Sequence, residues 1–157
     1  MKKVFLIFSV LVLALVCAVP LQVRAQGRAK SGPDASTVRD PELEKDSLHN
    51  LEVARHYFKL KKAYVAAIKR CEEIIAGNPT FARMDEVLYI AGESSLRLAD
   101  NRGKQAPNLP ADKLRDDARE YLSRLVQQYP ESSFTKQVES DLSSLGGPKK
   151  PEETNKQ

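Results

Sequence analysis

Apolar side chains recur every three to four positions through five successive segments of the chain, from about residue 41 to residue 145. Polar and charged side chains fill the positions between them. This period is that of an α-helix with one buried stripe, and none of these segments shows the strict alternation expected of a strand. The pattern therefore predicts an all-α fold of about five helices.

Capping residues place the ends of the predicted helices. Asp40-Pro41-Glu42 joins a capping side chain, a proline suited to the first helical position and an acid in the first turn. Lys61-Lys62 marks the turn to a second helix, which Gly77-Asn78-Pro79 ends, with the glycine suited to a left-handed cap. The remaining helices are expected at about 83–99 and 112–129, followed by a fifth that Ser132 or Ser133 caps and that ends near Leu145.

Two predicted hairpins share one order of small and large apolar residues. In each second helix an alanine is followed by larger apolar residues four and seven positions later and by a proline twelve positions later. The two sets are Ala67, Cys71, Ile74 and Pro79, and Ala118, Leu122, Leu125 and Pro130, and the preceding helices carry the pairs Leu51/Ala54 and Leu88/Ala91. Small residues let helices approach closely, and this order is typical of tetratricopeptide hairpins. We expect a short right-handed solenoid of two tetratricopeptide-like repeats and a closing helix, interrupted by a long loop at residues 100–111.

The two ends of the chain differ in composition from this helical part. Lys2 and Lys3 precede an apolar run over residues 4–19, and Val23-Arg24-Ala25 offers small residues at the positions that signal peptidase reads. The apolar run, at roughly 16 residues, is short of the ~20 that span a membrane. We expect a signal peptide (residues 1–25), a flexible leader (26–40), a helical domain (41–145) and a disordered tail (146–157). A lipid on Cys17 is the alternative to removal of the signal, although Val16 is a poor fit to the residue that precedes a lipidated cysteine.

Removal of the signal changes the charge balance. The chain has 25 Lys and Arg against 21 Asp and Glu, but Lys2, Lys3 and Arg24 leave with the signal, so 22 basic residues then face 21 acidic ones. A chain this close to neutral gives no indication of nucleic-acid binding.

No catalytic or metal-binding constellation is recognisable. His49 and His56 are seven residues apart, which is not the spacing of a metal pair on one helix face, and we expect both to be solvated. Cys71 occupies the position that Leu122 holds in the other repeat, so it is expected to pack in the core. The sequence predicts a protein that is not an enzyme and needs no cofactor.

Four segments resemble the later repeats of the BamD (YfiO)-type outer-membrane assembly lipoproteins, and the likeness covers about residues 48–145. They are Val53-Ala54-Arg55-His56-Tyr57, Ala63-Tyr64-Val65-Ala66-Ala67-Ile68-Lys69-Arg70, Glu86-Val87-Leu88-Tyr89 and Tyr129-Pro130-Glu131-Ser132. The resemblance implies an exported adaptor in the periplasm, at the inner face of the outer membrane, that docks on a barrel-assembly protein. Its membrane association would be peripheral or through a lipid on Cys17. Alternatives are an envelope-coordination repeat protein of the Tol-Pal-associated type and an accessory module for a cell-wall enzyme.

In repeats of this kind the first helix of each hairpin lines the concave face. This geometry nominates Arg55, Phe58 and Lys59 as partner-binding residues, with Leu51 and Leu88 beside them. Basic groups next to an aromatic ring suit an extended peptide or an acidic partner segment. The alternative is that Leu51 and Phe58 pack against the next hairpin while Arg55 and Lys59 are solvated.

Overall fold

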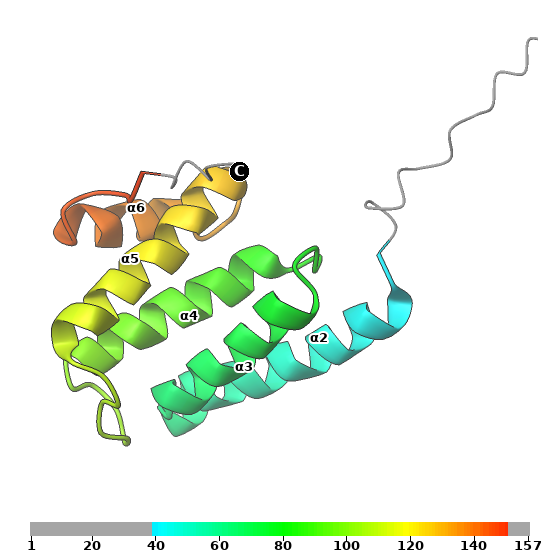
Figure 1. Cartoon of the computed structure of the whole chain (residues 1–157), viewed down its shortest axis with the longest axis horizontal. Helices are drawn as coiled ribbons and strands as arrows, with labels where there is room; N and C mark the ends of the chain where they lie inside the picture. The colour runs from blue at the N-terminus through cyan, green and yellow to red at the C-terminus, as the bar shows by residue number, and fades with distance from the viewer. Residues whose placement is uncertain (1–38, 151–157) are drawn as a thin grey trace, which may run out of the picture. The chain divides into compact units, whose positions relative to one another are not determined.

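The computed structural model describes residues 39–150, and all regular structure in this range is helical, as predicted (Figure 1). The helices are α2 (Pro41–Arg55), α3 (Tyr64–Gly77), α4 (Met84–Ala99), α5 (Ala111–Gln128) and α6 (Thr135–Ser144), and the π-helical turn η2 (His56–Lys61) continues α2. None of these helices is long and apolar enough to cross a membrane. The predicted signal peptide and most of the predicted leader lie outside the described residues.

The start of α2 matches its prediction, whereas the end of α3 does not. The Asp40 side chain accepts a hydrogen bond from the Glu42 amide, 2.9 Å away, and proline follows the cap. Gly77, expected to take a left-handed conformation, instead ends the helix without a positive φ. Asn78 leaves the helix with φ −142° and ψ 76°, because the following proline disfavours the helical conformation. Its buried amide donates to Ser47 of α2, 3.2 Å away, so the end of α3 is tied to α2.

The start of α6 also differs from its prediction. Neither Ser132 nor Ser133 is the cap residue, since α6 begins only at Thr135. Ser132 instead donates to the Asp85 carboxylate of α4, 2.7 Å away, and accepts from the Phe134 amide. This serine therefore ties the α5–α6 turn to the start of α4.

The C-terminal stop is as predicted, but part of the predicted tail is ordered against α5. Gly146 and Gly147 both have positive φ, at 86° and 89°, which ends the last helix. Arg119 then donates to the carbonyl oxygens of both glycines, and the Lys149 amide donates to Ser123. Residues 146–150 therefore lie against α5, and the rest of the predicted tail lies outside the described residues.

The π-helical turn η2 is a feature that the hydrophobic pattern did not predict. It ends at Lys62, which has a positive φ of 51°, and the Ala63 amide donates to the Tyr57 carbonyl across it. The left-handed Lys62 allows the chain to reverse within two residues, at the position where the lysine pair predicted the turn.

Helix α4 is the centre of the structure. Each helix runs back along the one before it, and α4 packs against both α3 and α5 and also contacts α2 (Figure 1). Twelve of its sixteen residues are buried, so α4 has little solvent-facing surface. The predicted close-packing residues Ala67 and Ala118 are fully buried on its two neighbours, as are Cys71 and Leu122.

The long loop between α4 and α5 packs against the turn between η2 and α3. The Lys104 amide donates to the Lys62 carbonyl, and the Gln105 side-chain oxygen accepts from the Val65 amide, each over 3.1 Å. Ala63, the cap residue of α3, has no side chain that can accept this bond. The loop therefore caps α3 from a distant part of the sequence, because the first amides of a helix need acceptors from outside it.

The close approach of α4 and α5 at Gly92 yields a stability test. A Cβ on Gly92 would lie 2.5 Å from Leu122 Cδ2 and 2.6 Å from its Cγ, whereas a Cβ on Gly77 would meet nothing within 4 Å. Alanine in place of helical glycine gains about 0.5–1 kcal/mol, so Gly77→Ala should stabilise the fold by up to that amount. Gly92→Ala should instead destabilise it by roughly 1–3 kcal/mol, because Leu122 must move. Urea unfolding followed by circular dichroism measures both, and equal stabilisation by the two variants would contradict the close approach.

Candidate functional site

Three of the five residues predicted to bind a partner are in the core. Leu51 and Leu88 have no exposed surface, and Phe58 is 5% exposed. The expectation that they line an open groove is wrong, because α4 packs over the stripe of α2 and η2 that carries Leu51 and Phe58. The alternative is confirmed for Leu51 and Phe58, which pack in the core, but its expectation that Arg55 is solvated is wrong.

Arg55 joins α2 to α4 and is not free to meet a partner. Its guanidinium donates to both carboxylate oxygens of Glu86, at 2.5 and 2.7 Å, and the two side chains are 23% and 11% exposed. This hydrogen bonding raises the pKa of Arg55. Burial favours the neutral form of Glu86, but the bonds and charge of Arg55 outweigh it and lower the pKa of Glu86. Charge reversal at Arg55 would set two acids against each other, leave Glu86 with Arg83 as its remaining partner at 2.8 Å, and destabilise the fold. Among the five predicted residues only Lys59 is exposed.

A second polar cluster lies near the contact of α4 with α6. The Arg97 guanidinium lies 4.3 Å from the centroid of the Phe58 ring and donates to Glu93 over 3.0 Å. The negative charge of Asp141 of α6 also acts on the Glu93 carboxyl. Burial and then the charge of Asp141 raise the pKa of Glu93, although Arg97 opposes them. In the described part of the chain, the buried Oδ2 of Asp141 has no hydrogen-bond partner.

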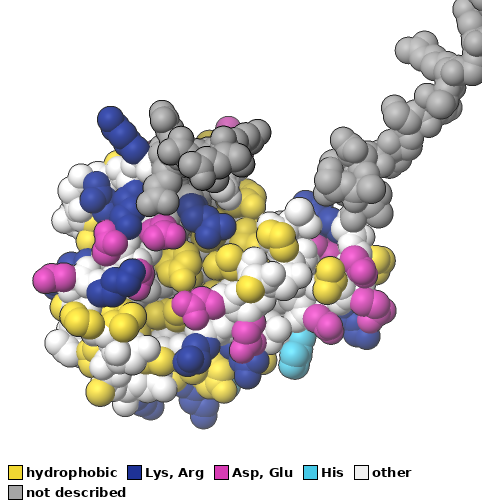
Figure 2. Space-filling view, viewed as in Figure 1, with side chains coloured by type: hydrophobic (Ala, Val, Ile, Leu, Met, Phe, Trp, Pro, Cys, Tyr) yellow, Lys and Arg dark blue, Asp and Glu magenta, His cyan; other side chains and the backbone are white. Residues whose placement is uncertain are grey.

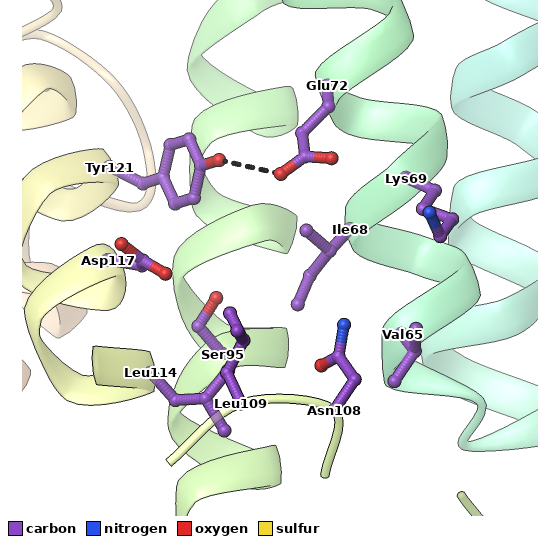
Figure 3. A pocket seen from close by; sticks show the side chains of 10 residues that line it. All are labelled: Val65, Ile68, Lys69, Glu72, Ser95, Asn108, Leu109, Leu114, Asp117 and Tyr121. Carbon is purple, nitrogen blue, oxygen red and sulfur yellow. Dashed lines mark hydrogen bonds between the residues drawn. The ribbon is translucent and has the colours of Figure 1, made fainter. Parts of the chain in front are cut away.

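The other face holds a cavity between α3 and α5, which lie on either side of α4 (Figure 3). It has a volume of about 70 Å³. We call it the α3–α5 cavity. Its apolar walls are Val65, Ile68, Leu109 and Leu114. Figure 2 shows hydrophobic side chains gathered in patches between charged ones on the surface of the protein.

Oxygen atoms make up most of the polar lining of the α3–α5 cavity. The Tyr121 hydroxyl reaches across from α5 and donates to Glu72 of α3 over 3.3 Å (Figure 3). Burial, and then the negative charge of Glu72, raise the pKa of Tyr121 above its ordinary value. Asp117 lines the α5 side and is paired with Lys113 over 2.5 Å. Ser95 of α4 and Asn108 of the long loop complete the polar lining.

A second hollow, of about 390 Å³, lies at the opposite end of the α4–α5 hairpin. The turn before α4 and the turn after α5 form its walls, and the hydrogen bond from Ser132 to Asp85 joins them. The two hollows thus lie at the two ends of one hairpin.

The described residues contain no group of three or more His, Cys, Asp or Glu side chains placed to hold a metal ion. His49 and His56 are exposed, as predicted. Cys71 is fully buried, as predicted, and burial raises the pKa of its thiol, which keeps it protonated and unreactive.

The residues around the α3–α5 cavity were not predicted as a site. Most of them lie on the second helix of each hairpin, with Ser95 on α4 and Asn108 and Leu109 on the long loop, whereas the resemblance directed attention to the first helix. Glu72 and Asp117 are ordinary surface acids in the sequence, and only the packing of α3 and α5 on α4 brings them to one cavity. The single available signal was the unusual length of the loop that supplies Asn108 and Leu109.

Comparison with known proteins yielded no match: no family model, no curated protein and no solved structure is significantly similar to the chain. The resemblance to BamD-type proteins therefore rests on the four quoted segments alone.

The contact between Glu93 and Asp141 predicts how stability changes with pH. Because the folded pKa of Glu93 is raised, its contribution to stability is fully present below its ordinary pKa, about 4.3, and is lost as the pH rises through the raised value. Asp141→Asn removes the repulsion. It should stabilise the protein at pH 7.5, where both carboxyl groups are charged, and by much less at pH 4.

Glu139→Gln is the matched control for this measurement, since Glu139 is an exposed acid on the same helix. Urea unfolding at pH 4 and pH 7.5 measures the free energy of unfolding of both variants and of the unchanged protein. A gain for Asp141→Asn that is the same at pH 4 and pH 7.5, or that Glu139→Gln reproduces, would show that the two carboxyl groups do not interact.

Proposed function

We propose that the protein is a non-enzymatic adaptor of two tetratricopeptide-like hairpins and a closing helix that works by binding other proteins. The equivalent burial of Ala67 in α3 and Ala118 in α5 supports the repeat assignment. The hairpins are α2–α3 and α4–α5, and α6 packs against α5 as the first helix of a further hairpin would.

The size of the α3–α5 cavity is the observation that carries the proposal. At about 70 Å³ it is well below the volume of small-molecule sites, which usually measure about 300–1,000 Å³. It therefore suits the end of one side chain. The second hollow reaches the lower end of that range, but its walls are two turns whose polar groups Asp85 and Ser132 bond to each other. Two hollows at the ends of one hairpin suit a long polypeptide partner.

The cellular setting comes from the sequence. The signal pattern in residues 1–25 and the resemblance to BamD-type repeats favour a periplasmic protein at the inner face of the outer membrane, attached peripherally or through a lipid on Cys17. The partner would be a barrel-assembly protein of that membrane. The binding surface would be the surface around the α3–α5 cavity, and not the surface around Arg55 that the sequence predicted.

A Tol-Pal-associated role is the second candidate, favoured by the Tyr129-Pro130-Glu131-Ser132 hairpin ending. Ser132 fixes the α5–α6 turn to Asp85, so this ending has a structural use in any such hairpin. It therefore discriminates weakly between the two roles. Neither hollow offers a reason to prefer an accessory module for a cell-wall enzyme.

Photo-crosslinking tests the adaptor proposal. A photoreactive amino acid replaces Glu72 or Asn108 at the rim of the α3–α5 cavity, or Lys45 or Glu139 elsewhere, and all four positions are exposed. In the native envelope, the two rim positions should yield adducts with the barrel-assembly protein, identified by mass spectrometry, and the two control positions should not. Adducts with Tol-Pal components would favour the second candidate. Equal yields at all four positions, or no adduct, would refute a binding surface at the cavity.

A further inference from the structure

This inference rests on the proposed function, in which a polypeptide binds at the α3–α5 cavity. The chemistry of the cavity then indicates which side chain of that polypeptide it would receive. Its apolar walls come from three directions, with Ile68 on α3, Leu114 on α5 and Leu109 on the long loop. Such walls favour an aliphatic chain and disfavour a short polar side chain, which would leave them in contact with water.

The polar part of the lining offers more acceptors than donors. The Tyr121 hydroxyl already donates to Glu72, and the Ser95 hydroxyl donates to the Ala91 carbonyl in its own helix. The Asn108 amide can both donate and accept, whereas the carboxylates of Glu72 and Asp117 only accept. A guest with donors therefore fits the two acids, and a guest carboxylate would meet two negative charges.

The lysine side chains near the α3–α5 cavity do not occupy it. Lys69 borders it but extends to the side of α3 away from α5 (Figure 3). Lys113 forms an ion pair with Asp117. The Lys113 side chain is 56% exposed and that of Asp117 is 24% exposed, so the lysine lies on the solvent side of the pair. Glu72 pairs with no Lys or Arg of the described residues within 4 Å. Glu72 is therefore the acid of the lining that has no cationic partner among the described residues, and its charge favours a cationic guest.

We propose that the α3–α5 cavity receives a lysine side chain of a partner polypeptide. The aliphatic stem lies against Ile68, Leu109 and Leu114, and the ammonium group donates to Glu72, Asp117 and Ser95. Lysine suits the cavity because its long apolar stem ends in a compact group with three donors. The long loop then has a use beyond capping α3, since Gln105 and Gly103 fix it against α3 and so hold the Leu109 wall in place.

The test is a titration of the purified protein, labelled at its Ile, Leu and Val methyl groups, with acetyl-Ala-Leu-Lys-Leu-Ala-amide. The lysine peptide should shift the methyl signals of Ile68 and Leu114. A peptide with norleucine in place of lysine keeps the stem without the charge, and it should bind at least about tenfold more weakly. Equal binding by both peptides would overturn the proposal.

Neighbouring residues supply matched controls. Glu72→Gln and Asp117→Asn should each weaken the lysine peptide at least about threefold, whereas Glu73→Gln and Asp116→Asn should change nothing, since these acids pair with Arg70 and Lys149 outside the cavity. Lys113→Gln should tighten binding because it frees Asp117. Equal losses in both pairs of variants would show a general charge effect and overturn the proposal.

Three further outcomes separate the explanations. If Lys30→Gln tightens the peptide, the chain's own leader competes for the cavity, and the assignment to a partner is wrong. If crosslinks form at Glu72 and Asn108 but the lysine peptide does not bind, this inference fails and the adaptor proposal stands. Peptide binding without any crosslinked partner would support the lysine site and refute the adaptor proposal.

Discussion

The close packing of α5 on α4 at Gly92 is the constraint on which the arrangement depends. Leu122 occupies the space that a side chain at this position would need. The Leu122 side chain of α5 therefore packs directly on the α4 backbone at Gly92. Small residues continue along α4 at Ala91, Ser94 and Ser95, all buried. Because α4 has small residues on several sides, α3 and α5 can both pack against it.

This arrangement produces the candidate site. Since α3 and α5 pack on α4, the space between them has α4 as its floor, and Ser95 lies there. The Tyr121–Glu72 hydrogen bond crosses this space, and the long loop covers its end near the start of α3. Core packing thus sets the width of the cavity, and the loop supplies a wall. The opposite face is closed by the Arg55–Glu86 pair and the Phe58 ring, which leaves little of it for binding.

The local parts of the fold were predictable from the sequence, and the parts that depend on packing were not. Helical periodicity and the Asp40 cap follow from neighbouring residues, so the elements and the start of α2 were predicted well. Gly77 was misjudged because Asn78 bonds to a distant helix, and the role of Arg55 was missed because Glu86 lies 31 residues away. The cavity was not predicted for the same reason, since its residues come from three helices and a loop and only packing brings them together.

Native-state amide hydrogen exchange at increasing urea concentrations tests the central role of α4 most directly. If α4 is the fixed element, amides in its middle, from Ile90 to Leu98, should exchange only when the whole domain unfolds, with the full free energy and urea dependence of global unfolding. Amides of α6 should exchange through smaller openings, because α6 is short and packs mainly on α5. Exchange in the middle of α4 through a local opening of lower free energy than that of α3 and α5 would contradict the account.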